Sequence, residues 1–379
     1  MSENSAAPDS ALKPENPPAI PPTAPSHGRV KTGFLVSVVL ILLGSVFAIY
    51  LSNNTPPQGG VKTRALLDPP ASPQLSPSPF LFQEMTIPAL RSRQYTSTLG
   101  ERQLFADNGS YTSYLTYFDS DGLKVNGLLT IPDGEMPEGG WPTIIFIHGY
   151  IPPTQYQTTT RYQEHVNALA RSGFIVFKID LRGHGKSEGE PGGGYFGADY
   201  VTDALNARAA LQSDDMVNKN KIGLWGHSMA GNIVLRAMAA QPEIPAAVIW
   251  AGAVYTYTDM QEYGIQDNSY TPLPSDTNRQ QKRQQLRELY GNPSAESWFW
   301  KMVAPTNYLS DIKGALQIDH AVNDDVVSIE YSRNLAKLAK DVNMTLDLNE
   351  YSSGGHNITG ASFNAAMQNT INFFKQHLK

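Results

Sequence analysis

The twenty residues KIGLWGHSMAGNIVLRAMAA, 221–240, decide the fold class of this chain. The short apolar run that ends at Trp225 is typical of a buried strand, and the run from Met229 onward is typical of a helix. Only Gly226-His227-Ser228 separates the two. A serine on so sharp a strand-to-helix turn projects its hydroxyl above the sheet, and small neighbours keep the strained backbone free of clashes. We therefore predict that Ser228 is a nucleophile; the alternative is an ordinary helix N-cap.

Outside this stretch, apolar runs alternate with amphipathic runs from about residue 80 to the C-terminus. Strands are expected at 111–118, 123–131, 143–147, 174–179, 221–225, 246–251, 315–320 and 344–348. Helices are expected at 161–171, 199–211, 229–240 and 329–340, and in a closing helix that carries Phe363, Met367, Ile371 and Phe374 on one face. Continuous apolar strands that alternate with helices indicate a mostly parallel sheet covered on both faces. We predict an α/β fold with a mostly parallel eight-stranded sheet, formed by residues 80–379.

One insertion, at about 253–305, interrupts the alternation. It contains a predicted helix near 280–290 and many aromatic residues. Loops at the carboxyl ends of parallel strands surround the ligand site. We therefore interpret the insertion as a lid that shapes the substrate pocket; the alternative is a helical excursion packed on the flank.

The predicted nucleophile needs a base, and the base needs an orienting carboxylate. On this topology the chain order is serine, then Asp or Glu, then His. Asp324 follows the predicted strand 315–320, and His356 follows the last predicted strand. We predict Asp324 as the orienting acid and His356 as the base, with Asp325 as the alternative carboxylate.

Negative charge that develops on a substrate oxygen needs preorganised N–H donors. We expect one donor from Met229, the residue after the nucleophile, and the second from Tyr150, in the loop that follows the strand 143–147. Asp180 and Arg182 are expected to pair with each other and to brace the neighbouring loop. Three further histidines are interpreted as scaffold residues that shape turns: His148, His184 and His227.

The N-terminal part of the chain has a different composition. Residues 1–33 are rich in Pro, Ala and Ser, which predicts a disordered tail. The uncharged run 34–51 would rise roughly 27 Å as a helix, close to the thickness of a bilayer core, and predicts a transmembrane helix; a cleaved signal peptide is the alternative. Residues 52–79 return to a Pro/Ser-rich composition and are interpreted as a stalk. The preceding Arg29 and Lys31 favour a cytoplasmic tail, so we expect a single-pass protein of the cell membrane with its catalytic domain outside the cytoplasm.

Composition excludes several classes of function. The net charge of −6 argues against a nucleic-acid partner, which would require a basic face. The chain has no cysteine, which excludes a cysteine nucleophile, a disulfide scaffold and a cysteine-ligated metal. Serine-based acyl transfer requires neither a metal nor an organic cofactor, and we expect none.

Several motifs together resemble the α/β-hydrolase superfamily. They are Ser120-Asp121-Gly122, Ile147-His148-Gly149-Tyr150, Asp180-Leu181-Arg182-Gly183-His184-Gly185, Gly226-His227-Ser228-Met229-Ala230-Gly231, Asp324 and His356. Ala230 departs from the usual G-x-S-x-G pattern, in which a second glycine stands at that position. The lead-in strands are similar to the catalytic domain of prolyl oligopeptidase-like serine peptidases, whereas the serine motif resembles equally the monoacylglycerol-lipase and feruloyl-esterase branches. The resemblance implies hydrolysis through a serine acyl-enzyme and favours short peptides as substrates, with small esters as the alternative.

Two further points bear on the substrate. A peptidase that recognises a substrate amine needs carboxylates near its pocket, and Glu262 and Asp267 in the predicted lid are the candidates. The segment before His148 is too short for a β-propeller, which leaves access to the pocket to the lid. A non-catalytic binding module of the same fold is a remote alternative, because such proteins usually lose a member of the triad.

Overall fold

The computed structural model describes residues 79–270 and 277–378 of this chain. They belong to a compact unit that spans Pro77–Lys379. The predicted tail, transmembrane helix and all but the last residue of the predicted stalk lie outside the described residues. Within the described ranges, no helix combines the length and the apolar character that crossing a bilayer requires.

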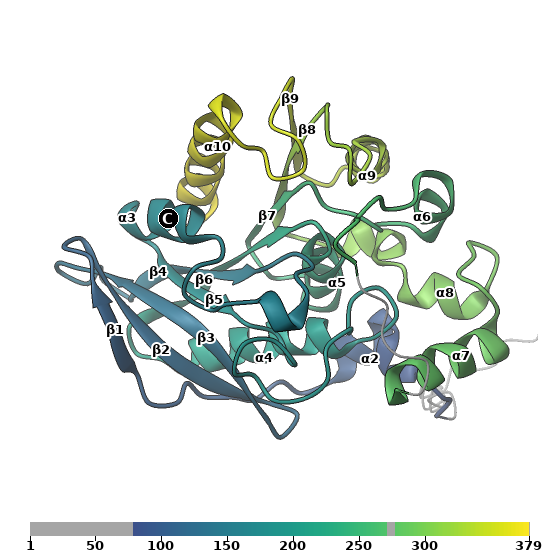
Figure 1. Ribbon diagram of the computed structural model, residues 1–379, viewed down its shortest axis with the longest axis horizontal. Coiled ribbons are helices and arrows are strands. Elements are labelled where there is room, and N and C mark those ends of the chain that lie inside the picture. The colour runs from purple at the N-terminus through teal and green to yellow at the C-terminus, as the bar shows by residue number, and fades with distance from the viewer. Residues whose placement is uncertain (1–78, 271–276, 379) are drawn as a thin grey trace, which may run out of the picture. The chain divides into compact units, whose positions relative to one another are not determined.

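In the described residues, a nine-stranded sheet forms the centre of the fold, with the order β1-β2-β3-β5-β4-β6-β7-β8-β9 (Figure 1). The strands β1, β2 and β3 are antiparallel, and β3 also pairs antiparallel with β5. The remaining six strands, from β5 to β9 in sheet order, are parallel. The strand bounds are Gln103–Asp107, Tyr111–Ser120, Leu123–Pro132, Trp141–Ile147, Ile175–Ile179, Val217–His227, Ala246–Trp250, Ala315–Ala321 and Leu346–Tyr351. The prediction of a mostly parallel sheet is confirmed, and each of the eight predicted strands is present.

The count of eight strands is wrong, because β1, Gln103–Asp107, adds a ninth at the edge of the sheet. Four of its five residues are exposed, including Leu104 and Phe105. A strand of this kind is held by backbone hydrogen bonds to β2 alone, and it buries no apolar face. Hydrophobic periodicity therefore does not mark it in the sequence.

Helices cover both faces of the sheet and bury a separate apolar core on each. The helices α3 (Gln163–Arg171) and α10 (Ala361–His377) cover one face, on which Phe146, Val248 and Phe374 pack together. The opposite face carries α2 (Ile87–Ser92), α4 (Asp199–Gln212), α5 (Ala230–Ala240) and α9 (Glu330–Asp341). Because β4 and β7 are buried on both faces, their residues alternate between the two cores, as a parallel sheet requires.

The predicted lid is a helical segment between β7 and β8. It contains α6 (Tyr257–Tyr263), α7 (Asn278–Tyr290) and α8 (Trp298–Val303), followed by the short helix η3 (Pro305–Asp311). In Figure 1, the green helices α6, α7 and α8 lie past α5, on the side of the molecule opposite β1–β3. The predicted helix near 280–290 is thus confirmed as α7.

Parallel strands bring four loops to one edge of the sheet. The register places Ile147 of β4 opposite Gly226 of β6, so the loop with Tyr150 begins beside the loop with Ser228. It also places Ala321 of β8 opposite Tyr351 of β9, so the loops with Asp324 and His356 begin side by side.

Candidate active site

Ser228 occupies a strained turn between β6 and α5. Its φ is +55°, in the left-handed region that a non-glycine residue rarely adopts. Its N–H donates to the carbonyl oxygen of Trp250 at 2.9 Å, and its own carbonyl oxygen accepts from the N–H of Gly231 at 2.9 Å. Both peptide groups beside the side chain are therefore tied to neighbouring elements, which holds the strained conformation in place.

Small residues make room for this turn. A Cβ on Gly226 would lie 2.7 Å from Cγ2 of Val234, and a Cβ on Gly149 would lie 3.1 Å from Cβ of Ser228. The loop after β4 therefore packs directly against the nucleophile turn, and a side chain at either glycine would crowd its neighbours. Ala230, the departure from the usual pattern, is fully buried in α5 and is accommodated there.

His356 is held by Asp324. Nδ1 of His356 donates to Oδ2 of Asp324 at 2.8 Å, and the Asp324 side chain is completely buried. The other carboxylate oxygen, Oδ1, accepts the N–H groups of Val326 and Val327, both at 2.9 Å. Because Nδ1 carries the proton, Nε2 is the basic nitrogen of a neutral His356.

The charge of Asp324 is strongly stabilised. Burial opposes the charged form, but hydrogen bonds from His320 and His356 outweigh that cost and hold the pKa of Asp324 well below its usual value. Nε2 of His320 lies 3.0 Å from Oδ2 of Asp324. The partner of His356 is thus Asp324, whereas the alternative, Asp325, lies in the wall of the adjoining cavity.

The loop after β4 carries the predicted oxyanion donor Tyr150. Nδ1 of His148 lies 2.7 Å from the carbonyl oxygen of Gly149, which fixes the plane of the Gly149–Tyr150 peptide group. Burial lowers the pKa of His148 to about 3, and its other ring nitrogen, Nε2, lies 3.1 Å from the carbonyl oxygen of Asp180, so both ring contacts are with backbone groups. Tyr150 and Met229 line one cavity together with Ser228, so the structure brings the two predicted donors to the nucleophile.

Two cavities share Ser228, Tyr150 and Asp267 in their walls. The first has a volume of about 700 Å³ and includes His356, Asp325 and polar residues at the start of α3. The second has a volume of about 370 Å³ and is mainly aromatic and aliphatic. Its further lining residues include Tyr195, Phe196, Tyr200, Met229, Met260 and Ile265. Ser228 therefore borders one polar and one apolar cavity.

The two carboxylates proposed for amine recognition have different positions. Asp267 lines both cavities, whereas Glu262 lies exposed on α6, outside the residues that line either cavity. Arg283 of α7 also lines the second cavity and donates to the carbonyl oxygen of Gly192 at 3.2 Å. The sequence did not identify Arg283, because nothing in a helix of polar residues indicates which of them faces a pocket.

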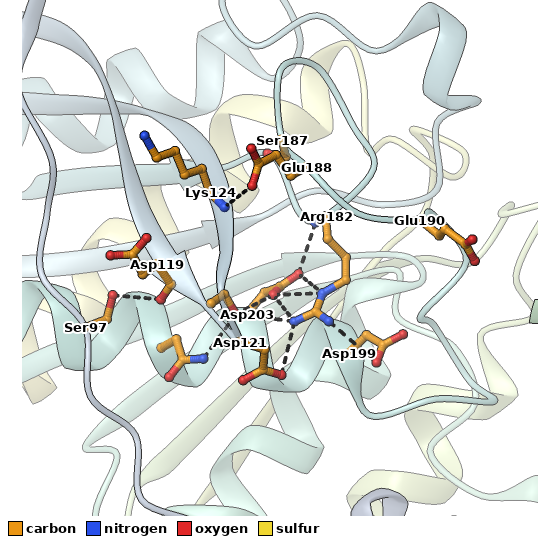
Figure 2. Close-up of polar contacts among 12 residues, drawn as sticks. Ser97, Asp119, Asp121, Lys124, Arg182, Ser187, Glu188, Glu190, Asp199 and Asp203 are labelled. Carbon is orange, nitrogen blue, oxygen red and sulfur yellow. Dashed lines mark hydrogen bonds and ion pairs between the residues drawn. The ribbon is translucent and has the colours of Figure 1, made fainter.

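Arg182 does not pair with Asp180, and this expectation is corrected. Its guanidinium binds Asp203 of α4, with Nη2 and Oδ1 2.6 Å apart, and also lies near Asp121 and Asp199 (Figure 2). Asp180 instead accepts the hydroxyl of Tyr156 at 2.8 Å. The reason is that β5 ends at Ile179, and Arg182, in the loop that follows, is directed toward α4. The buried pair still braces this loop, whose residues His184, Pro191 and Gly192 form part of the second cavity.

In residues 79–270 and 277–378, no group of three or more His, Asp or Glu side chains is arranged to hold a metal ion.

The fold and the site define a class of protein. A nucleophile turn between a parallel strand and a helix, followed along the chain by a paired Asp and His, is the arrangement of an α/β-hydrolase-fold serine hydrolase. The profile of the family described as serine aminopeptidase, S33, matches residues 142–361, more than half of the chain. The chain belongs to this family and is a serine hydrolase, which confirms the superfamily resemblance stated from the sequence.

Known proteins similar to the chain include peptidases and esterases. The uncharacterized peptidase YtmA of Bacillus subtilis (strain 168) is 24% identical over 64% of this chain and 85% of its own length. The solved acetyl xylan esterase from Paenibacillus sp. R4 has a TM-score of 0.53 at 17% identity, over 77% of this chain and 92% of its own. The dipeptidyl peptidase 4 of Porphyromonas gingivalis has a TM-score of 0.53 at 18% identity, over 76% of this chain and 44% of its own. At these identities the solved structures show the fold.

Proposed function

We propose that this serine hydrolase forms an acyl-enzyme at Ser228 and hydrolyses short peptides, while anchored to the cell membrane by residues 34–51. The single observation that carries the catalytic part is the constellation of a strained Ser228 that shares a cavity with His356, whose Nδ1 is bound to a buried Asp324. The similarity to a protein named as a peptidase supports the choice of peptides.

The proposed reaction has two acyl-transfer steps. Oγ of Ser228 attacks the substrate carbonyl carbon while Nε2 of His356 takes the hydroxyl proton, and the N–H groups of Tyr150 and Met229 stabilise the resulting oxyanion. The intermediate collapses, the bond to the leaving group breaks, and the leaving amine or alcohol takes the proton from His356. Water then attacks the acyl-enzyme with His356 again as base, which releases the acid and restores Ser228. Asp324 holds the imidazole in the required tautomer and stabilises its transient positive charge.

Labelling with a fluorophosphonate tests the nucleophile. We expect the full-length chain to be labelled and the Ser228→Ala variant to lose both labelling and turnover. Ser269→Ala is the matched control, because Ser269 is an exposed serine in the wall of the first cavity and should still permit labelling. A Ser228→Ala variant that is labelled like the wild type would contradict the assignment.

Asp267 supports peptides over esters as substrates. Its carboxylate adjoins both cavities beside Ser228, where it can bind the ammonium group of a substrate. Asp267→Asn is expected to raise KM for aminoacyl p-nitroanilides about tenfold and to leave p-nitrophenyl acyl esters nearly unaffected, because only the former carry an amine. Glu262→Gln, on the same lid but away from the cavities, should change neither. Equal effects of Asp267→Asn on both substrate types would contradict amine recognition.

A carboxylesterase is the second candidate function. The apolar and aromatic wall of the second cavity favours it, because that wall can accept an acyl chain that carries no amine. Rapid turnover of p-nitrophenyl esters with no detectable turnover of any aminoacyl anilide would select this alternative.

The membrane anchor rests on the apolar run 34–51 and on the flanking Arg29 and Lys31. Fractionation of cells that express the full-length chain tests it. We expect the intact protein in the membrane fraction, accessible to protease from outside the cytoplasm. An intact N-terminus on a protein recovered in the soluble fraction would contradict the anchor.

A further inference from the structure

Tyr162 and His227 connect the loops that carry the proposed catalytic groups. The N–H of Gly149 donates to the hydroxyl oxygen of Tyr162 at 3.1 Å, and this hydroxyl lies 2.8 Å from Nδ1 of His227. Nε2 of His227 lies 2.9 Å from the carbonyl oxygen of His356. The contacts therefore run from the loop after β4, through the residue next to Ser228, to the loop after β9.

Each of these hydrogen bonds has one possible direction. A carbonyl oxygen only accepts, so Nε2 of His227 carries a proton and donates a hydrogen bond to the carbonyl oxygen of His356. Burial, and secondarily the neighbouring His356, lowers the pKa of His227 to about 3, so the ring is neutral and its Nδ1 is an acceptor. Tyr162 must then donate its hydroxyl proton to Nδ1 and accept from Gly149. Burial raises the pKa of Tyr162 to about 12, which keeps that proton on the oxygen.

Tyr162 is held in this role by its surroundings. It stands immediately before α3 with φ +60°, a conformation that is unfavourable for a bulky residue. Its ring packs against Phe146 at 5.3 Å and against Trp225 at 6.0 Å between centroids. Strain of this kind persists only where the surroundings determine the position of the side chain, and such positions cluster at functional sites.

We propose that Tyr162 and His227 are positioning residues, which hold the Gly149–Tyr150 loop and the backbone of His356 in register with Ser228. The proposal rests on the function proposed above. Gly149 immediately precedes the proposed oxyanion donor, and a Cβ on it would lie only 3.0 Å from Nδ1 of His227 and 3.1 Å from Cβ of Ser228, so this loop packs directly against the nucleophile turn. A displacement of about 1 Å between such groups lowers the rate of reaction about 100-fold, although the substrate still binds.

The test compares two tyrosine variants of the full-length chain. Tyr162→Phe removes only the hydroxyl, and we expect kcat and the rate of fluorophosphonate labelling to fall about 10- to 100-fold with KM nearly unchanged. Tyr111→Phe is the matched control: Tyr111 is also buried and donates to Asn167 of α3 at 2.6 Å, but it lies on β2. It should lower the melting temperature to a similar extent and leave kcat within about twofold of the wild type.

Variants at position 227 keep the test decisive if Tyr162→Phe folds poorly. His227→Gln retains an amide that can donate to the carbonyl oxygen of His356, whereas His227→Leu retains only a side chain of similar size. We therefore expect kcat to be highest in the wild type, lower in His227→Gln and lowest in His227→Leu.

Nitrogen-15 NMR of histidine-labelled wild-type chain should show His227 protonated on Nε2 and unprotonated on Nδ1. An active wild type with equal kcat in Tyr162→Phe and Tyr111→Phe, or a His227 protonated on Nδ1, would overturn the positioning role. A wild type that neither labels nor turns over any ester or anilide would instead overturn the proposed function itself.

Discussion

At the scale of single residues, the site combines one strained group with one fully buried charge. The backbone of Ser228 adopts an unfavourable conformation, and its carbonyl oxygen also accepts from Ala253 at 3.3 Å, which adds a third tie to the surrounding fold. Asp324 keeps its charge in a buried position because four donors surround it. Neighbours in the fold offset both costs, which fixes the backbone of Ser228 and the carboxylate of Asp324.

Replacing the buried carboxylate tests this arrangement. Asp324→Asn is expected to lower kcat by about 1,000- to 10,000-fold, because an amide does not hold His356 in the tautomer with an unprotonated Nε2. The adjacent Asp325→Asn should lower it less than about tenfold, since Asp325 lies in the cavity wall and does not bind Nδ1 of His356. Steady-state kinetics on one p-nitrophenyl ester checks both variants. A larger loss in Asp325→Asn than in Asp324→Asn would contradict the assignment of the acid.

At the scale of elements, α7 depends on polar contacts for its place over the second cavity. Leu286 is its one buried residue among those described. Arg279 binds the carboxylate of Asp199 on α4 at 2.7 Å and the carbonyl oxygen of Glu190 at 3.0 Å, and Arg283 binds the next part of the same loop. At the end of the helix, Tyr290 stacks on Phe299 of α8 with ring centroids 4.0 Å apart, so the arginine contacts hold chiefly the earlier part of α7.

Removing one of these contacts should loosen α7 without unfolding the protein. Arg279→Ala is expected to raise KM about fivefold, corresponding to about 1 kcal/mol, and to leave kcat nearly unchanged. Amide hydrogen exchange in α7 should accelerate in the same variant. Arg287→Ala, an exposed arginine on the same helix, is the control and should have neither effect. Unchanged exchange in Arg279→Ala would show that this contact does not hold the helix.

At the scale of the whole molecule, burial of neutral histidines governs the response to acid. Burial lowers the pKa values of His148, His165 and His227 to about 3 each. The unfolded chain therefore binds more protons than the folded one between about pH 6.5 and pH 3, and stability is lost as the pH falls through this window. Burial also raises the pKa values of Asp180 and Asp319 to about 6. The folded chain therefore binds these two protons at a higher pH than the unfolded chain. The free energy of unfolding rises from this source as the pH falls below about 6, which offsets part of the loss.

The net effect is predicted to be destabilising. Between pH 7 and pH 5 the three histidines together cost about 6 kcal/mol, and the two carboxyl groups together return about 3 kcal/mol. The free energy of unfolding should therefore fall by on the order of 3 kcal/mol between pH 7 and pH 5. Urea unfolding at both pH values measures it. Stability that stays level or increases toward pH 5 would contradict the assignment of these histidines as buried and neutral.

The amino-acid sequence by itself determined the elements of the parallel core and the order of the serine, acid and base along the chain. Apolar runs and helical periodicity are local properties, and a nucleophile turn such as Gly226-His227-Ser228 is a local motif, so both can be read without knowing the fold. The parallel arrangement also implies that loops such as those of Asp324 and His356 emerge at one edge.

Only the tertiary structure decided which polar groups meet. Arg182 pairs with Asp203, and Tyr162 lies between Gly149 and His227. Asp267 lies beside Ser228, whereas Glu262 is exposed to solvent. The edge strand β1 also joins the sheet only in the folded structure. The physical reason is that burying an apolar side chain is non-directional and needs only the right period, whereas a hydrogen bond requires two particular atoms at one distance and angle. That geometry arises when segments distant in the sequence pack together, and composition and spacing do not encode it locally.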